Sequence, residues 1–218
     1  MGTPLYAVED GAVVVSGSDT IPMCGDEQKT VCGRELNPPG GYYGQLVVLQ
    51  LDNDYNGQKV FALYGHLSGT TVDVGDYVRK GDQIGMIGMT GVALGPHVHF
   101  EIRIGVNDYA HTRNPILWMQ PLPGRGSIAG RYTDAKGNLV RAADVNLYRA
   151  DSDTFLYSTE TYGRDKWSPV NADQVLDENF SMPDLTPGDY IIRIPNTQFA
   201  SRVTVQEGTL AFVQVGEP

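Results

Sequence analysis

Glycine and proline interrupt this chain so often that only short segments of regular structure fit between them. The 218 residues contain 26 glycines and 13 prolines, and the apolar runs between them are short and rich in β-branched residues. One run, residues 45–51, is separated from the next, residues 60–64, by an Asp-Asn-Asp-Tyr-Asn-Gly segment. Asn, Asp and Gly between β-prone runs are typical of hairpins. The sequence therefore predicts an all-β protein.

A proline- and glycine-rich segment divides the chain into two predicted β domains. The segment Pro121-Leu122-Pro123-Gly124-Arg125 is the clearest break in the sequence, because both residue types end regular structure. We expect it to form a linker, residues 121–125, between a first domain at residues 1–120 and a second at residues 126–218. About seven short strands are expected in the second domain, which is the pattern of a β-sandwich.

Charge and hydropathy exclude two classes of partner. The formal net charge is −10, and Lys and Arg form no cluster, whereas binding to nucleic acid requires clustered positive charge. We therefore expect no nucleic-acid partner. No run of about 18 apolar residues occurs, so no membrane-spanning helix is expected. The first residues lack the charged and apolar regions of a signal peptide, so any export signal would precede them.

Two histidines stand two residues apart in the segment His97-Val98-His99-Phe100-Glu101. Side chains at positions i and i+2 share one face of a strand, so the sequence predicts that the His97 and His99 imidazoles lie on the same side. Such a pair suits a metal site in which one ring binds the ion and the other handles protons. For an isolated His-x-His, an ordinary pair of exposed or core histidines is the alternative.

Further motifs accompany this pair along the first domain. Together with them, residues 2 to about 119 resemble the lysostaphin-like (LytM-type) zinc endopeptidases, which cut the peptide part of bacterial peptidoglycan. The resemblance implies a lysostaphin-like (duplicated hybrid motif) antiparallel β-sheet domain. It is carried by Gly2-Thr3-Pro4-Leu5-Tyr6-Ala7-Val8-Glu9-Asp10-Gly11, Tyr64-Gly65-His66-Leu67-Ser68, Val74-Gly75-Asp76-Tyr77-Val78-Arg79-Lys80-Gly81-Asp82-Gln83-Ile84-Gly85, Gly88-Met89-Thr90-Gly91 and the closing Asn114-Pro115.

The resemblance also implies roles for three histidines. His99 corresponds to a zinc ligand of the family. His97 corresponds to a residue beside the zinc-bound water that assists proton transfer or steadies the transition state, and His66 shares this role. A catalytic zinc takes about three protein ligands and lowers the pKa of its water to roughly 7. A neutral imidazole near that pKa can accept and return a proton.

The sequence departs from the family pattern in one respect. The family's other two zinc ligands belong to a His-x-x-x-Asp motif shortly before the Gly-Thr-Pro segment, and this sequence begins at Met1. His111 follows the His-x-His segment, and Glu9 and Asp10 align with a turn, so none of them replaces the missing pair. We therefore expect weak zinc binding and little activity from this chain alone. Either preceding residues complete the site, or the protein has lost the motif and kept the fold as a module.

Residues next to the histidines are expected to shape the site. Glu101 shares a strand face with His99 and is predicted either to orient an imidazole or to be a solvated carboxylate. Thr90, Gly95 and Pro96 are expected to shape the loop that enters the histidine segment.

The segment from residue 17 to residue 41 is long for a hairpin loop, and long loops are often functional. It contains Cys24 and Cys32 with no histidine nearby, which makes a poor zinc site. A disulfide that closes the loop, indicating an oxidising compartment, is one interpretation, and two free thiols are the other. Tyr42 and Tyr43 follow and either line a groove for an extended peptide or pack at a strand edge.

Residues 126–216 resemble the prealbumin-like β-sandwich of carboxypeptidase-regulatory and collagen-adhesin B-type modules. The resemblance rests on the segments at residues 130–137, 145–148 and 180–190. A spacer or wall-targeting role is our working hypothesis for this domain, since a fold by itself does not establish a function. The stretch from Phe155 to Trp167 either contacts glycan or protein or covers the core.

The whole sequence favours an exported bacterial endopeptidase. Its expected cofactor is zinc, and its expected partners are peptidoglycan peptides or cell-surface proteins. The bonds cut in the family lie in glycine- or D-alanine-containing cross-bridges. A catalytically silent binding, regulatory or structural module is the alternative, and a carbohydrate-binding adhesin built on the second domain is a third. The oligomeric state stays open.

Overall fold

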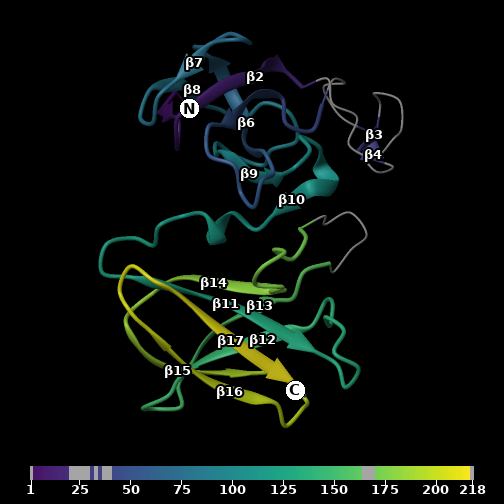
Figure 1. Cartoon of the computed structure of the whole chain (residues 1–218), viewed down its shortest axis with the longest axis vertical. Coiled ribbons are helices and arrows are strands. Elements are labelled where there is room, and N and C mark those ends of the chain that lie inside the picture. The colour runs from purple at the N-terminus through teal and green to yellow at the C-terminus, as the bar shows by residue number, and fades with distance from the viewer. Residues whose placement is uncertain (1, 20–29, 32–33, 36–40, 164–169, 217–218) are drawn as a thin grey trace. The chain divides into compact units, whose positions relative to one another are not determined.

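The computed structural model describes residues 2–19, 30–31, 34–35, 41–163 and 170–216. It is all-β, as the sequence predicts, and it divides into two compact units, Met1–Thr112 and Arg113–Pro218 (Figure 1). The predicted linker at residues 121–125 falls within the second unit, and its role as a linker stays a prediction. Cys24, Cys32 and Trp167 lie outside the described residues.

The first unit is built on one sheet in the order β1-β8-β6-β5-β2-β7, and β9 and β10 continue it beside β6. Its strands are β1 (Pro4–Tyr6), β2 (Gly11–Ser18), β5 (Gln45–Leu51), β6 (Val60–Thr70), β7 (Tyr77–Val78), β8 (Gln83–Ile87), β9 (His99–Ile104) and β10 (Thr112–Arg113). A separate pair consists of β3 (Thr30–Val31) and β4 (Arg34–Glu35). The 3-10 turn η1 (Tyr109–His111) belongs to the first unit, and the 3-10 turn η2 (Pro115–Leu117) belongs to the second.

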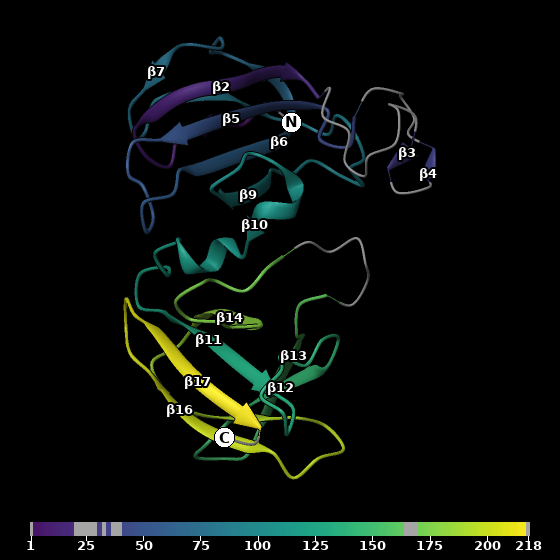
Figure 2. The ribbon, with the colours of Figure 1, turned by 45° about the vertical axis from the view of Figure 1, so that its right-hand side comes forward.

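Two adjacent central strands contain nearly continuous apolar runs. The strand β5 reads Gln-Leu-Val-Val-Leu-Gln-Leu, and the first eight residues of β6 are all buried. Strands that are covered on both faces lose the polar alternation of surface strands, which is why these two runs occupy the centre of the sheet. Figure 2 shows β5 and β6 side by side. Buried side chains of these strands form a core with Tyr43, which precedes β5; the strand members are Leu46, Val48, Phe61 and Leu63.

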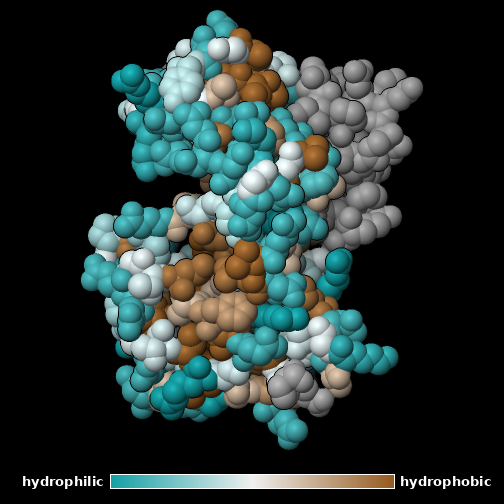
Figure 3. Space-filling view, viewed as in Figure 1, coloured by the Kyte–Doolittle hydropathy of each residue, from teal (hydrophilic) through white to brown (hydrophobic). Residues whose placement is uncertain are grey.

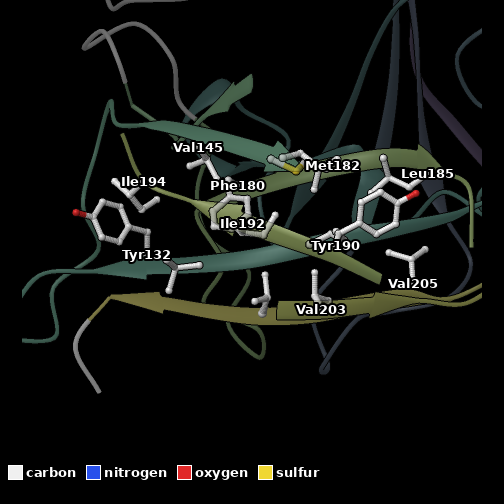
Figure 4. Packing of buried hydrophobic residues seen from close by; sticks show 14 residues of the cluster. Tyr132, Val145, Phe180, Met182, Leu185, Tyr190, Ile192, Ile194, Val203 and Val205 are labelled. Atoms are coloured by element: carbon white, nitrogen blue, oxygen red, sulfur yellow. The ribbon is translucent and has the colours of Figure 1, made fainter. Parts of the chain in front are cut away.

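The second unit contains two sheets that share one core. Three strands lie in the order β14-β11-β17 and four in the order β13-β12-β15-β16. The strands are β11 (Gly126–Thr133), β12 (Asp144–Arg149), β13 (Phe155–Glu160), β14 (Phe180–Leu185), β15 (Gly188–Arg193), β16 (Ala200–Val205) and β17 (Leu210–Gly216). Figure 4 shows core side chains of both sheets, among them Phe180 of β14 and Ile192 of β15, gathered between them.

Residues before the predicted linker also belong to this unit. The Asn114 amide caps η2 by accepting from the Ile116 N–H and donates to the Tyr162 hydroxyl and to Ser181 Oγ. On the surface, apolar residues gather in the lower half of Figure 3, and Phe212 of β17 is among the exposed apolar side chains of this unit. No helix in the described part of the chain has the length and apolar character needed to cross a membrane.

Candidate functional site

His66 lies where the central strand β6 changes its partner. Residues 60–65 of β6 pair with β9, ending at the Gly65–His99 pair, and from Leu67 onward β6 pairs with β8. At the junction, the His66 backbone has a φ of 60°, which is uncommon for a residue with a side chain. The His66 N–H donates to the Tyr43 carbonyl at 2.7 Å. The change of partner therefore places a buried histidine in a constrained backbone conformation.

Three imidazoles meet around this point. The ring centroids of His66 and His97 are 4.8 Å apart, and those of His66 and His99 are 5.5 Å apart. His66 is buried, His99 is partly buried and His97 is exposed. The structure starts β9 at His99, so His97 precedes the strand, where it forms a bridge with Gly88. The three predicted site histidines thus form one cluster that runs from the interior to the surface.

Two backbone carbonyls orient the rings of His66 and His97. The Nδ1 atom of His66 lies 2.8 Å from the Thr90 oxygen, and the Nδ1 atom of His97 lies 2.8 Å from the Gly95 oxygen. A carbonyl oxygen only accepts, so each Nδ1 carries the proton and each Nε2 keeps a lone pair in the neutral ring. Both rings can therefore accept a proton at Nε2.

Burial lowers the pKa of His66, and the Thr90 carbonyl acts in the opposite direction. The nearby His99 and His97 rings lower this pKa further. Since the ordinary pKa of histidine is about 6.5, His66 is neutral at pH 7. A neutral imidazole is the form that accepts protons.

A carboxylate orients the ring of His99 through a hydrogen bond. Its Nε2 atom lies 2.8 Å from Oε1 of Glu101, and because a carboxylate accepts, Nε2 carries the proton and Nδ1 keeps the lone pair. A histidine that binds a metal ion almost always donates its other N–H to a carboxylate, carbonyl or water. His99 therefore has the arrangement of a metal ligand, and Glu101 has the orienting position that the sequence left open.

Glu101 is itself fixed by a buried network and is only 4% exposed, so it is not a solvated carboxylate. Its Oε1 accepts from the Tyr43 hydroxyl at 2.6 Å. Its Oε2 accepts from Arg103 Nε at 2.9 Å and Nη2 at 2.8 Å, and from Thr112 Oγ1 at 3.3 Å. Each oxygen thus faces donors only.

Charge and hydrogen bonding keep Glu101 ionised. Burial raises its pKa, but the hydrogen bond from His99, the charge of Arg103 and the hydrogen bond from Tyr43 together hold that pKa below its usual value. Burial is the first cause of the raised pKa of Tyr43, so this hydroxyl stays protonated and can donate. The carboxylate is therefore a permanent acceptor for the His99 N–H.

Sequence reasoning did not single out Arg103, whose side chain is fully buried. Its position in the sequence could have identified it, because residues 99, 101 and 103 are alternate residues of β9 and share one face of the strand.

The two predicted tyrosines lie in different surroundings. Tyr43 is buried and belongs to the Glu101 network, whereas Tyr42 is partly buried, and its ring centroid is 5.8 Å from those of His66 and His99. Tyr42 thus borders the histidine cluster.

The remaining site predictions concern metal binding. In the described part of the chain, no group of three or more His, Cys, Asp or Glu side chains could hold a metal ion. His111 donates from Nδ1 to Asp108 at 2.5 Å. Among the three clustered histidines, His99 differs from the other two in that its N–H is donated to a carboxylate and not to a backbone carbonyl.

Comparison with known proteins identifies a family for the first half of the chain. The model described as peptidase family M23 matches residues 1–113. Lysostaphin of Staphylococcus simulans is 26% identical over 165 residues, which cover 75% of this chain and 28% of lysostaphin. The peptidoglycan DD-endopeptidase ShyA of Vibrio cholerae serotype O1 is 34% identical over 102 residues, covering 47% of this chain and 18% of ShyA.

A solved structure gives a similar match. The catalytic domain of lysostaphin from Staphylococcus simulans, crystallised without phosphate, is 26% identical with a TM-score of 0.41, covering 54% of this chain and 71% of that domain. The chain spans less than a third of the length of the two curated relatives named above.

Proposed function

The chain belongs to peptidase family M23, and we propose that it is a zinc-dependent endopeptidase that hydrolyses the peptide part of bacterial peptidoglycan. The proposed substrates are glycine- or D-alanine-containing cross-bridge or stem peptides. Relatives named as lysostaphin and as a peptidoglycan DD-endopeptidase support this substrate class. An exported, cell-envelope location goes with it.

The observation that carries the proposal is the histidine cluster with its ordered tautomers. His66 and His97 both present an Nε2 lone pair and lie within 4.8 Å of each other by ring centroid. One ring can take the proton of the attacking water, and a protonated ring can return a proton to the leaving amine. The exposed position of His97 suits it to contact solvent and substrate, whereas His66 is held rigidly in the interior.

We assign His99 as a zinc ligand through Nδ1, because its Nε2 is committed to Glu101. A zinc ion at this place would polarise the substrate carbonyl and lower the pKa of a bound water. Since a catalytic zinc takes about three protein ligands, the other ligands in this proposal lie outside the described residues.

A second function is favoured by one observation, the absence of a group of three metal-binding side chains among the described residues. In this alternative the fold serves as a binding, regulatory or structural module at the cell surface. The second unit, a two-sheet domain with its own core, would act in either case as a spacer or a wall-targeting module.

Zinc content and peptide cleavage test the proposal together. The chain is purified without added metal, its zinc is measured by elemental analysis, and cleavage of cross-linked peptidoglycan peptides is followed with and without added zinc. We expect zinc-stimulated cleavage that falls by about 100-fold or more in His97→Ala. His111→Gln is the matched control, because this histidine bonds Asp108, and it should cleave like the wild type.

The outcomes separate the two functions. Cleavage that survives both chelation and His97→Ala would refute the zinc-peptidase proposal. Binding of the same peptides with no cleavage and no zinc would favour the module. One zinc per chain would show that ligands within these 218 residues complete the site.

A further inference from the structure

Thr90 lies in the segment between β8 and β9, and its side chain reaches two central strands. The hydroxyl donates to the Leu67 carbonyl of β6 at 2.6 Å and accepts from the Gln45 N–H of β5 at 2.8 Å. A threonine hydroxyl has one proton to donate and lone pairs that accept. A single hydroxyl therefore ties this segment to both strands.

Close backbone contact leaves the segment little freedom to shift. A Cβ atom on Gly44 would lie 2.4 Å from the Gly91 nitrogen, and one on Gly91 would lie 2.4 Å from the Gly44 nitrogen. The Val92 N–H also donates to the Tyr42 carbonyl at 2.9 Å. Because both glycines have positive φ and no side chain, the two backbones can touch here.

These contacts between the β8–β9 segment and the sheet determine where the Thr90 carbonyl points. The same residue whose hydroxyl bonds Leu67 and Gln45 presents its carbonyl to His66 Nδ1 at 2.8 Å. Leu67 directly follows His66, so the hydroxyl and the carbonyl of one residue hold both the ring of His66 and the backbone beside it. The tautomer of His66 is thus set by a residue 24 positions away in the sequence.

We propose that Thr90 is a positioning residue for the reaction: its hydroxyl fastens the β8–β9 segment to β5 and β6, so that its carbonyl keeps His66 in the Nδ1–H tautomer with Nε2 turned to proton transfer. The effect on catalysis rests on the proposed function, whereas the tautomer of His66 can be measured whether or not the chain is active. The competing role is purely structural, in which the hydroxyl joins loop to sheet and His66 keeps its tautomer without it.

The test combines three variants with a readout of the imidazole. Thr90→Val removes the hydroxyl and keeps the shape, and Thr90→Ser restores the hydroxyl. Thr71→Val is the matched control, because Thr71 Oγ1 also donates to a carbonyl, that of Gln83, at 2.9 Å. The chain has four histidines, so nitrogen NMR on ¹⁵N-histidine-labelled protein at a pH well above the histidine pKa reports each tautomer.

We expect Thr90→Val to turn His66 from one tautomer into a mixture and to lower kcat at least tenfold with little change in KM. Thr90→Ser should restore both, and Thr71→Val should change neither. A folded Thr90→Val protein whose His66 signals match the wild type would overturn the inference. If Thr90→Val does not fold, Thr90→Ala, which lacks the extra methyl groups, takes its place with the same two outcomes.

Failure of the proposed function would look different. A wild-type chain without peptidase activity would leave kcat unmeasurable, yet the His66 tautomer in the Thr90 variants would still decide whether Thr90 holds the ring. Conversely, an active enzyme with an unchanged tautomer in Thr90→Val would refute the positioning role alone.

Discussion

Replacing Glu101 with glutamine should destabilise the first unit strongly and change the tautomer of His99. The substitution keeps the size of the side chain but removes the charge opposite Arg103, which is fully buried. It also replaces one acceptor oxygen with an NH₂ group. All four partners of the carboxylate donate to it in the wild type: Tyr43, His99, Arg103 and Thr112.

The geometry predicts which way the new amide turns. Arg103 can only donate, so the amide oxygen should face it, and the NH₂ group should face His99. His99 can accept at Nε2 only by moving its proton to Nδ1, which removes the lone pair that we assign to zinc. Glu101→Gln should therefore abolish metal binding at His99 while leaving the histidine itself in place.

The magnitude follows from the burial of the pair. Removing one partner of a buried ion pair costs about 3–5 kcal/mol, since the other charge is left uncompensated. At about 4 °C per kcal/mol for a domain near this size, the melting temperature of the first unit should fall by roughly 12–20 °C. Glu101→Gln combined with Arg103→Met removes both charges and should cost less than Glu101→Gln alone.

The chain contains its own control for this measurement. Trp118 belongs to the second unit, so its emission, measured with Trp167→Phe in both the wild-type and the Glu101→Gln background, follows that unit, while circular dichroism follows both. In Glu101→Gln, the dichroism transition of the first unit should move and the tryptophan transition should stay. A Glu101→Gln protein that melts within about 2 °C of the wild type would refute the buried ion pair as described.

Three further results are expected. His66→Asn should be more stable than His66→Val by roughly 1–2 kcal/mol in urea denaturation, because asparagine tolerates positive φ; equal midpoints would contradict a strained backbone. Gly44→Ala should destabilise the first unit by more than about 1 kcal/mol, since its Cβ would meet Gly91 at 2.4 Å with φ at +64°, and an unchanged midpoint would argue against this contact. Burial raises the pKa of Glu178, so its stabilising effect is complete below the unfolded pKa and is lost as pH rises through the folded pKa. Wild type should therefore gain stability relative to Glu178→Gln as the pH falls toward the ordinary glutamate pKa, measured in the tryptophan transition; a difference that stays constant with pH would count against this.

Much of the fold follows from local patterns in the sequence. The apolar run predicted at residues 45–51 is β5, with the same bounds, and the run predicted at residues 60–64 lies within β6. Runs such as these form strands because β-branched and aromatic side chains pack well on a pleated surface. The strand β13 (Phe155–Glu160) was not predicted as a strand, because its exposed apolar residues and polar neighbours lack clear alternation.

The candidate site was also predicted in part from the sequence. The sequence alone identified His66, His97 and His99 by their motifs, and placed Glu101 on the face of His99 by its spacing. The structure then brought the three imidazoles together, with β9 starting two residues later than the predicted histidine strand.

Only the tertiary structure decided how these groups are held. Tyr43 reaches Glu101 across 58 residues of chain, and Thr90 reaches His66 across 24. Such contacts depend on the register of β5, β6, β8 and β9, and local sequence patterns carry no information about which strands pair. The sequence thus determined the residue types that we propose for proton transfer and metal binding. The tautomers and the burial of these residues arise from strand pairing, because hydrogen bonds between distant residues form only once the sheet has assembled.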